Sequence, residues 1–187
     1  MNYLLYIIGG LLCFPLIGES TTVKPFAFEG LCESAQSIVH VRCLEKKSLM
    51  LPDREGVFTQ YRFDVVERIK GDTGQELVLV LPGGHVDGRH LEVLGMPKFV
   101  PGQETVLFLS EKDAHGSPWP VGLGQGCYGI AVGEDGKRQV VFEGHHPKVA
   151  GLRSKPAFQN KVALQSFLGT IREVLKIEAV DEDSRKQ

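Results

Sequence analysis

A glycine-rich stretch that contains one cysteine offers the first candidate chemistry in this chain. Residues 121–130 read VGLGQGCYGI, in which Gly124, Gly126 and Gly129 match the dinucleotide-binding pattern G-x-G-x-x-G. That pattern binds a pyrophosphate where a strand precedes it, a helix follows at once and an acidic residue lies about twenty positions on. Here strand-like residues follow, and the next helical pattern begins about thirty residues later. We therefore predict no cofactor, and interpret the glycines as a strand bend or bulge.

Three cysteines follow the N-terminal apolar segment, at Cys32, Cys43 and Cys127. In an exported chain an odd number leaves one cysteine over. Cys43 alternates with valines, so we expect it to be buried. We favour a Cys32–Cys127 disulfide; a Cys43–Cys127 disulfide and three unpaired thiols are the alternatives. No catalytic-cysteine signature surrounds Cys127, which argues against a nucleophile.

Histidines and one aspartate form the second candidate cluster. His85, Asp87 and His90 lie within six residues, and His145-His146 adds an adjacent pair. These side chains can bind metals, but the spacing spans a glycine turn and lacks the usual arrangement of zinc ligands. We interpret them as loop histidines, with metal binding by His85, Asp87 and His90 as the alternative.

No signature of a serine hydrolase, a metalloprotease or a carboxylate pair is present, so we predict that the protein is not an enzyme.

The formal charge of the 187-residue chain is −2, which does not indicate nucleic-acid binding. The polar face of residues 58–70 mixes Arg62, Arg68 and Lys70 with Asp64 and Glu67, which also argues against nucleic acid.

The N-terminus predicts export. Residues 3–17 are apolar but are interrupted by Gly9, Gly10 and Pro15, and are too short for a comfortable membrane span. We expect residues 1–20 to be a signal peptide cleaved after Ser20, which makes the protein secreted or periplasmic with no membrane contact after cleavage. An uncleaved N-terminal anchor is the minority alternative.

The remaining pattern predicts a mainly β protein. Strand signals occur at residues 38–44, 58–69, 77–81, 105–109, 119–132 and 139–142, with a hairpin or loop at 85–94. Residues 77–81 (LVLVL) are apolar on both faces, as in a central strand. Leu164, Leu168, Ile171 and Leu175 recur with helical spacing and predict a helix over residues 157–177. We expect one domain over residues 21–180, a small antiparallel OB-type β-barrel with this helix packed on it, and a charged tail at 181–187. A β-sandwich is the alternative.

The order of these features resembles the netrin-like module, the OB-type barrel of the tissue inhibitors of metalloproteinases. The resemblance covers residues 30–134. It rests on CESAQSIVHVR from Cys32, YRFDVVERIKG from Tyr61, the strand at 77–81, Pro101-Gly102 with the VLFL strand after it, and Gly126-Cys127. Uncharacterised secreted bacterial domains with VLKG, PGG and GLxQGKF patterns look closer still.

The resemblance implies a disulfide between Cys32 and Cys127, because these residues occupy the places of a bonded pair in the family. The inhibitors also carry a Cys-x-Cys at the mature N-terminus that binds the target's zinc. Here the expected start is TTVKPFAF, so that mechanism is not transferred.

We therefore expect a non-catalytic interaction module with an extracytoplasmic protein partner. Its binding surface is predicted on loops 82–99 and 112–120, since loops on a rigid scaffold commonly carry binding. A protease inhibitor that acts through a loop and a metal-binding protein are the alternatives.

Overall fold

The computed structural model describes residues 25–142, 146 and 161–184, with side chains up to residue 176. The expected signal peptide and residues 157–160 of the expected helix lie outside the described residues. Within the described part, no helix combines the length and apolar character that a membrane span requires.

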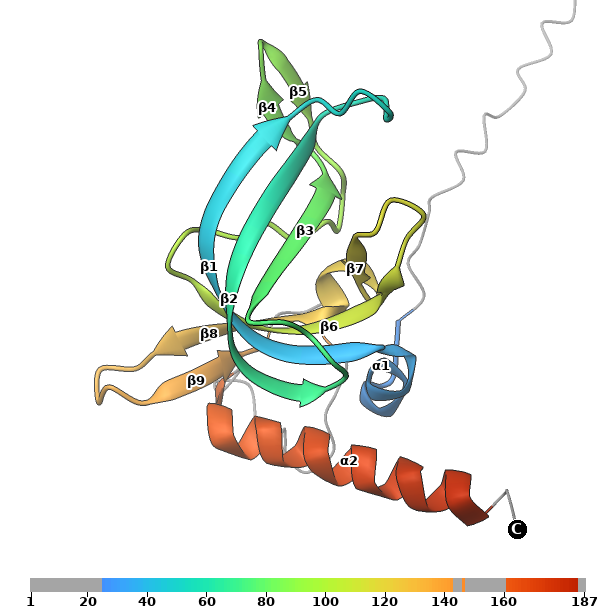
Figure 1. Cartoon of the computed structure of the whole chain (residues 1–187). Coiled ribbons are helices and arrows are strands. Elements are labelled where there is room, and N and C mark those ends of the chain that lie inside the picture. The colour runs from blue at the N-terminus through green and yellow to red at the C-terminus, as the bar shows by residue number, and fades with distance from the viewer. Residues whose placement is uncertain (1–24, 143–145, 147–160, 185–187) are drawn as a thin grey trace, which may run out of the picture.

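The chain is mainly β, with an antiparallel sheet and a C-terminal helix (Figure 1). The elements in chain order are α1 (Phe28–Ser34), β1 (Ser37–Leu49), β2 (Phe58–Lys70), β3 (Glu76–Pro82), β4 (Gly84–Val86), β5 (Arg89–Leu91), β6 (Glu104–Lys112), β7 (Pro118–Pro120), the 3-10 helix η1 (Leu123–Gly126), β8 (Cys127–Val132), β9 (Arg138–Val141), β10 (Lys161–Ala163) and α2 (Leu164–Ser184).

The strands form one large sheet and one small hairpin. The large sheet has the order β10-β9-β8-β6-β1-β2-β3, with β7 paired to β6, whereas β4 and β5 pair only with each other. Its outer strands β3 and β10 do not pair with each other, so no closed barrel is found among the described residues, and the OB-type barrel expected from the sequence is not confirmed. Since eight strands share one hydrogen-bonded sheet, the arrangement also differs from a two-sheet sandwich.

Two apolar cores lie on opposite faces of this sheet. The helix-side core contains α1, α2 and one face of β1, β6 and β8; its large members are Phe28, Leu31, Ile38, Phe108, Tyr128, Phe142, Phe167, Leu168 and Ile171. The strand-side core lies within the curve of β1, β2, β3 and β6; its members include Val39, Val41, Cys43, Tyr61, Phe63, Leu79, Phe99, Leu107 and Leu109. Side chains alternate along a strand, so β6 contributes to both cores.

Several sequence-based expectations are confirmed at this level. Val39, Val41 and Cys43 share the strand-side core, and Asp87-Gly88 forms the tight turn of the β4–β5 hairpin, with φ of 49° and 72°. Positive φ at both central residues is the type I′ pattern that suits a two-residue hairpin. The helix of the C-terminal part is also present.

Both ends of one helix and the position of one strand differ from the expectations. The helix α2 begins at Leu164 rather than residue 157, because Lys161–Ala163 pair with β9 as β10, and it continues to Ser184 into the expected tail. Strand β3 is an edge strand of the described sheet, with Val78 42% exposed, not a central strand. Its apolar outer face misled the prediction, because periodicity does not identify a strand's neighbours.

The glycine run is more sharply bent than a continuous strand. It forms η1 between β7 and β8; Gly122 before η1 and Leu123 at its start have φ of 62° and 57°. A Cβ on Gly126 would lie 2.5 Å from the Val121 carbonyl oxygen and 3.1 Å from that of Phe108. Close backbone approach therefore explains this glycine, and β8 follows where a cofactor-binding helix would be required.

The contact at Gly126 predicts a measurable cost of adding one methyl group. We expect Gly126→Ala to lower the free energy of unfolding by about 3 kcal/mol, because backbone atoms of two segments must move. Chemical denaturation of the purified protein measures this. Gly169→Ala is the matched control: it lies in α2 with nothing within 4 Å of the added Cβ, and should be neutral or stabilising by up to about 1 kcal/mol. Equal effects of the two substitutions would contradict the account.

Candidate functional site

The predicted histidine cluster lies on the β4–β5 hairpin, at the opposite end of the molecule from α2 (Figure 1). His85 and His90 face each other across the two strands, with ring centroids 6.2 Å apart. Asp87 occupies the turn instead of joining them. Within the described residues, no three histidine, cysteine or acidic side chains form a group that could hold a metal.

The other described histidines have different environments. His40 is buried on β1, and its Nε2 lies 3.0 Å from a Glu104 carboxylate oxygen. Burial raises the pKa of Glu104, but hydrogen bonds from Arg42 and His40 outweigh it and hold that pKa below its usual value. His146 is buried, stacks on Tyr128 at 4.3 Å and bonds the Cys127 carbonyl oxygen at 2.8 Å. These two histidines have structural roles.

The structure contains no disulfide among the cysteines it describes, so the predicted Cys32–Cys127 bond is not observed. Cys32 belongs to the helix-side core, whereas Cys127 packs against the strand-side core. The sheet therefore separates the two residues. Cys43 and Cys127 are apart as well, because Cys127 pairs with Leu107, which pairs with Val39, four residues before Cys43. That offset is about 13 Å along a strand, too far for a disulfide.

The Cys127 thiol has the properties of a packed side chain rather than of a nucleophile. It donates a hydrogen bond to the Leu123 carbonyl oxygen at 3.7 Å. Burial raises the pKa of this thiol far above its usual value, which opposes formation of the reactive thiolate.

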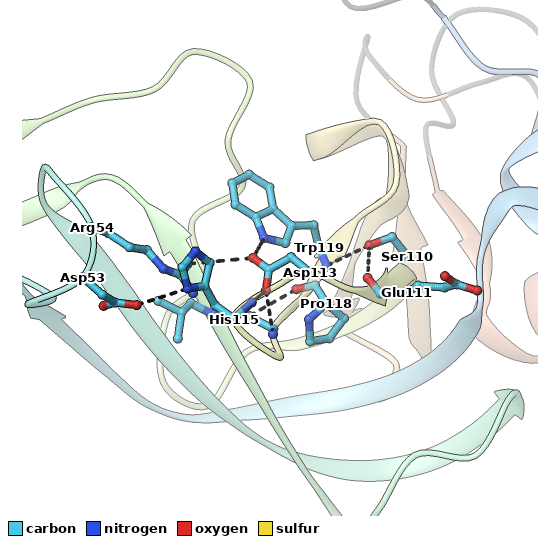
Figure 2. Close-up of polar contacts among 10 residues, drawn as sticks. Asp53, Arg54, Ser110, Glu111, Asp113, His115, Pro118 and Trp119 are labelled. Carbon is cyan, nitrogen blue, oxygen red and sulfur yellow. Dashed lines mark hydrogen bonds and ion pairs between the residues drawn. The ribbon is translucent and has the colours of Figure 1, made fainter.

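The most organised polar cluster joins two loops that lie far apart in sequence (Figure 2). Asp113 lies at the start of the β6–β7 loop, and one oxygen of its carboxylate accepts backbone N–H groups of His115 and Ser117 at 2.9 and 3.0 Å. The other oxygen accepts the Trp119 indole N–H at 3.1 Å. Burial raises the pKa of Asp113, but these hydrogen bonds and nearby Arg54 outweigh it and hold that pKa below its usual value.

The second loop, residues 50–57, packs against this cluster through two charged contacts. The Arg54 guanidinium lies 3.8 Å from the Asp113 carboxylate and 5.6 Å from the ring centre of Phe58. The neighbouring Asp53 carboxylate lies 3.1 Å from His115 Nδ1. Arg54 is only 13% exposed at its side chain, so its position is determined by packing as well as by charge. The two loops therefore form one surface.

A third segment, residues 92–96, presents an exposed leucine. Met96 N–H bonds the Val93 carbonyl at 3.2 Å, and Gly95 has φ of 78°, which define a tight turn with Leu94 at its tip. Leu94 is 91% exposed. The turn is supported from behind, because Gly124 N–H bonds the Gly95 carbonyl at 3.0 Å and Met96 packs against the strand-side core.

We call residues 50–57, 92–96 and 112–118 the loop platform. Its segments are connected through the strands beneath them: Ser117 Oγ accepts the Val80 N–H of β3 at 3.1 Å, and Trp119 packs against the same core as Met96. Met50 and Leu94 are the large apolar side chains that it exposes. Arg54 and Trp119, of residue types enriched in protein interfaces, both contact Asp113 at the edge of this platform.

Sequence reasoning located part of this platform and missed the groups that organise it. The predicted loops 82–99 and 112–120 contain the Leu94 turn and Asp113, but Asp53, Arg54 and the loop at 50–57 were not singled out. The signal was present in Asp113-x-x-Gly116, a turn pattern in which the carboxylate bonds nearby backbone N–H groups, and in the single tryptophan of the chain. The contact with Arg54 required the fold.

No protein-family model matches the chain, and neither curated proteins nor solved structures yield a match.

The network around Asp113 predicts a large and pH-dependent effect of its removal. We expect Asp113→Ala to lower the free energy of unfolding by about 1–3 kcal/mol, since three N–H donors, two of them partly buried, lose a charged acceptor. Because folding lowers the pKa of Asp113, its contribution is present above its unfolded pKa and is lost as the pH falls through its folded pKa. The difference between wild type and Asp113→Asn should therefore shrink in acid.

Denaturant unfolding at a series of pH values measures both effects. Asp53→Ala is the matched control from the same platform, because the Asp53 side chain is 58% exposed in its pair with His115. An exposed pair contributes at most about 1 kcal/mol. A loss for Asp113→Ala no larger than that for Asp53→Ala would show that the network does not hold the loops.

Proposed function

We propose that the protein is a secreted or periplasmic, non-catalytic protein-interaction module of netrin-like OB type, and that the loop platform is its binding surface. The observation that carries the proposal is Leu94, which is 91% exposed at the tip of a turn that is hydrogen-bonded from behind. An apolar side chain on a turn whose backbone is already held in place can enter a partner's pocket with a small ordering cost.

The strand order supports the OB part of the proposal. The neighbouring strands β3-β2-β1-β6-β8 are antiparallel throughout. A five-stranded barrel would be complete if β3 also approached β8, whose residues 130–132 pair with β9. OB barrels are partly open Greek-key barrels that bind ligands on loops and one strand face.

Nucleic-acid binding, the common alternative for this architecture, is disfavoured by the charges on β2. Arg62 pairs with Glu45 at 3.2 Å, and Lys70 donates to the Cys32 carbonyl oxygen at 2.8 Å. Glu67 bonds Arg172 of α2. Two of the cations on this strand, Arg62 and Lys70, thus already have acceptors, and the acidic Glu67 lies between them in the sequence.

Photo-cross-linking from the platform tests the binding surface. We expect a benzoylphenylalanine at position 94 to capture one predominant extracytoplasmic protein in the native host, because the side chain would lie in the interface. Position 132 is the matched control: Val132 is also highly exposed, at 69%, but lies at the end of β8. Equal capture from both positions would contradict the platform, and Leu94→Asp should abolish the specific complex while the protein stays folded.

A protease inhibitor that acts through a loop is the second candidate, because the same exposed Leu94 could enter the specificity pocket of a protease that prefers large apolar residues. Purified protein should then inhibit a chymotrypsin-like or subtilisin-like enzyme, and Leu94→Asp should weaken inhibition at least a hundredfold. Leu94→Met should keep most of it. If the protein inhibits no serine, cysteine, aspartic or metalloprotease, this second candidate is excluded. The interaction-module proposal would not be affected by that result.

A further inference from the structure

The β4–β5 hairpin holds two histidines in fixed register on one face. The two-residue type I′ turn at Asp87-Gly88 connects the strands directly, so their pairing register is fixed. His85 is the direct cross-strand partner of His90. Directly opposed residues in an antiparallel pair carry side chains on the same side, with Cβ atoms about 5 Å apart. Arg89 pairs with Val86 at the adjacent register position, so alternation places it on the other face.

The base of the hairpin is anchored to the large sheet. Thr59 Oγ1 donates to the Gly83 carbonyl oxygen at 2.7 Å, and Gly83 N–H donates to the Val57 carbonyl oxygen at 2.8 Å. A Cβ at Gly84 would lie 2.6 Å from the hydroxyl oxygens of Ser48 and Thr59, so the chain leaves the sheet at close contact. The hairpin therefore presents its histidines from a supported position, not from a loose loop.

Both imidazoles are accessible and lie at a separation that a metal ion can bridge. His85 and His90 are exposed, and their ring centroids are 6.2 Å apart with the planes inclined at 44°. A ring nitrogen binds zinc at about 2 Å, which puts each ring centre about 3 Å from the metal and two bound rings up to about 6 Å apart. Small side-chain rotations thus suffice for both nitrogens to reach one ion.

We propose that His85 and His90 form a two-histidine site for a divalent transition-metal ion, with water completing the coordination. Imidazole nitrogens favour copper(II), nickel(II) and zinc(II), whereas calcium and magnesium require oxygen ligands. Copper(II) binds most tightly of these by the general order of divalent affinities. Asp87 is not a ligand in this site because it occupies the turn. Glu92 is also not included as a ligand, because its carboxylate accepts a hydrogen bond from Lys98 Nζ at 2.6 Å.

Titration of the untagged purified protein with copper(II) chloride, followed by calorimetry, tests the site. We expect one ion per chain from the hairpin, and at least tenfold weaker binding in His85→Ala and in His90→Ala, since either change removes half of the protein ligands. The ring proton signals of both histidines should also shift together in NMR spectra on addition of zinc(II) chloride. Circular dichroism confirms that each variant is folded.

His115→Ala is the matched control, because His115 is an exposed loop histidine outside the hairpin that pairs with Asp53; it should bind copper as the wild type does. Two results would overturn the proposal: no binding at copper concentrations up to about 1 mM, or binding that survives both hairpin substitutions. The outcome is independent of the platform proposal, which concerns Leu94 and a protein partner.

Discussion

Strand β6 is buried on both faces, and the two cores of the protein meet along it. Val106 and Phe108 pack toward α1 and α2, while Leu107 and Leu109 pack toward β2 and β3. Each such side chain contributes about 1.5–3 kcal/mol when fully buried. The strand also pairs with β1, β7 and β8, so its register determines where the connecting loops emerge. The apolar run at 106–109 is thus the constraint on which the remaining structure depends.

The loop platform is a consequence of that constraint. Asp113 comes directly after β6, and Trp119 lies on β7, which pairs back onto β6. Their hydrogen bond therefore closes a hairpin whose base is fixed by the double-sided core. Arg54 reaches the same carboxylate from the β1–β2 connection. A surface made of loops gains rigidity in this way without strands of its own, which reduces the entropy cost of binding.

The sequence predicted which segments form strands and helices better than it predicted which elements pack or pair with one another. Alternation in β1 and the helical spacing of Leu164, Leu168 and Ile171 were sufficient to identify a strand and a helix. An element buried on one face has apolar residues at regular intervals in the sequence. The expectation for β3 was wrong because its outer residue Val78 is apolar without being covered. Pairings at long range left no local signal: Glu104 bonds His40 across 64 positions. The opposed faces of Cys32 and Cys127 likewise depend on the sheet, not on spacing.

The central claim is that the platform is ordered before any partner binds. Backbone NMR relaxation of the unbound protein tests it most directly, at the amides of His115 and Ser117, whose N–H groups bond the Asp113 carboxylate. The account predicts order parameters near about 0.85, as in rigid backbone, at these amides and at Gly95. Values below about 0.6 at the same amides would contradict it, because the loops would then be flexible and would become ordered only on binding.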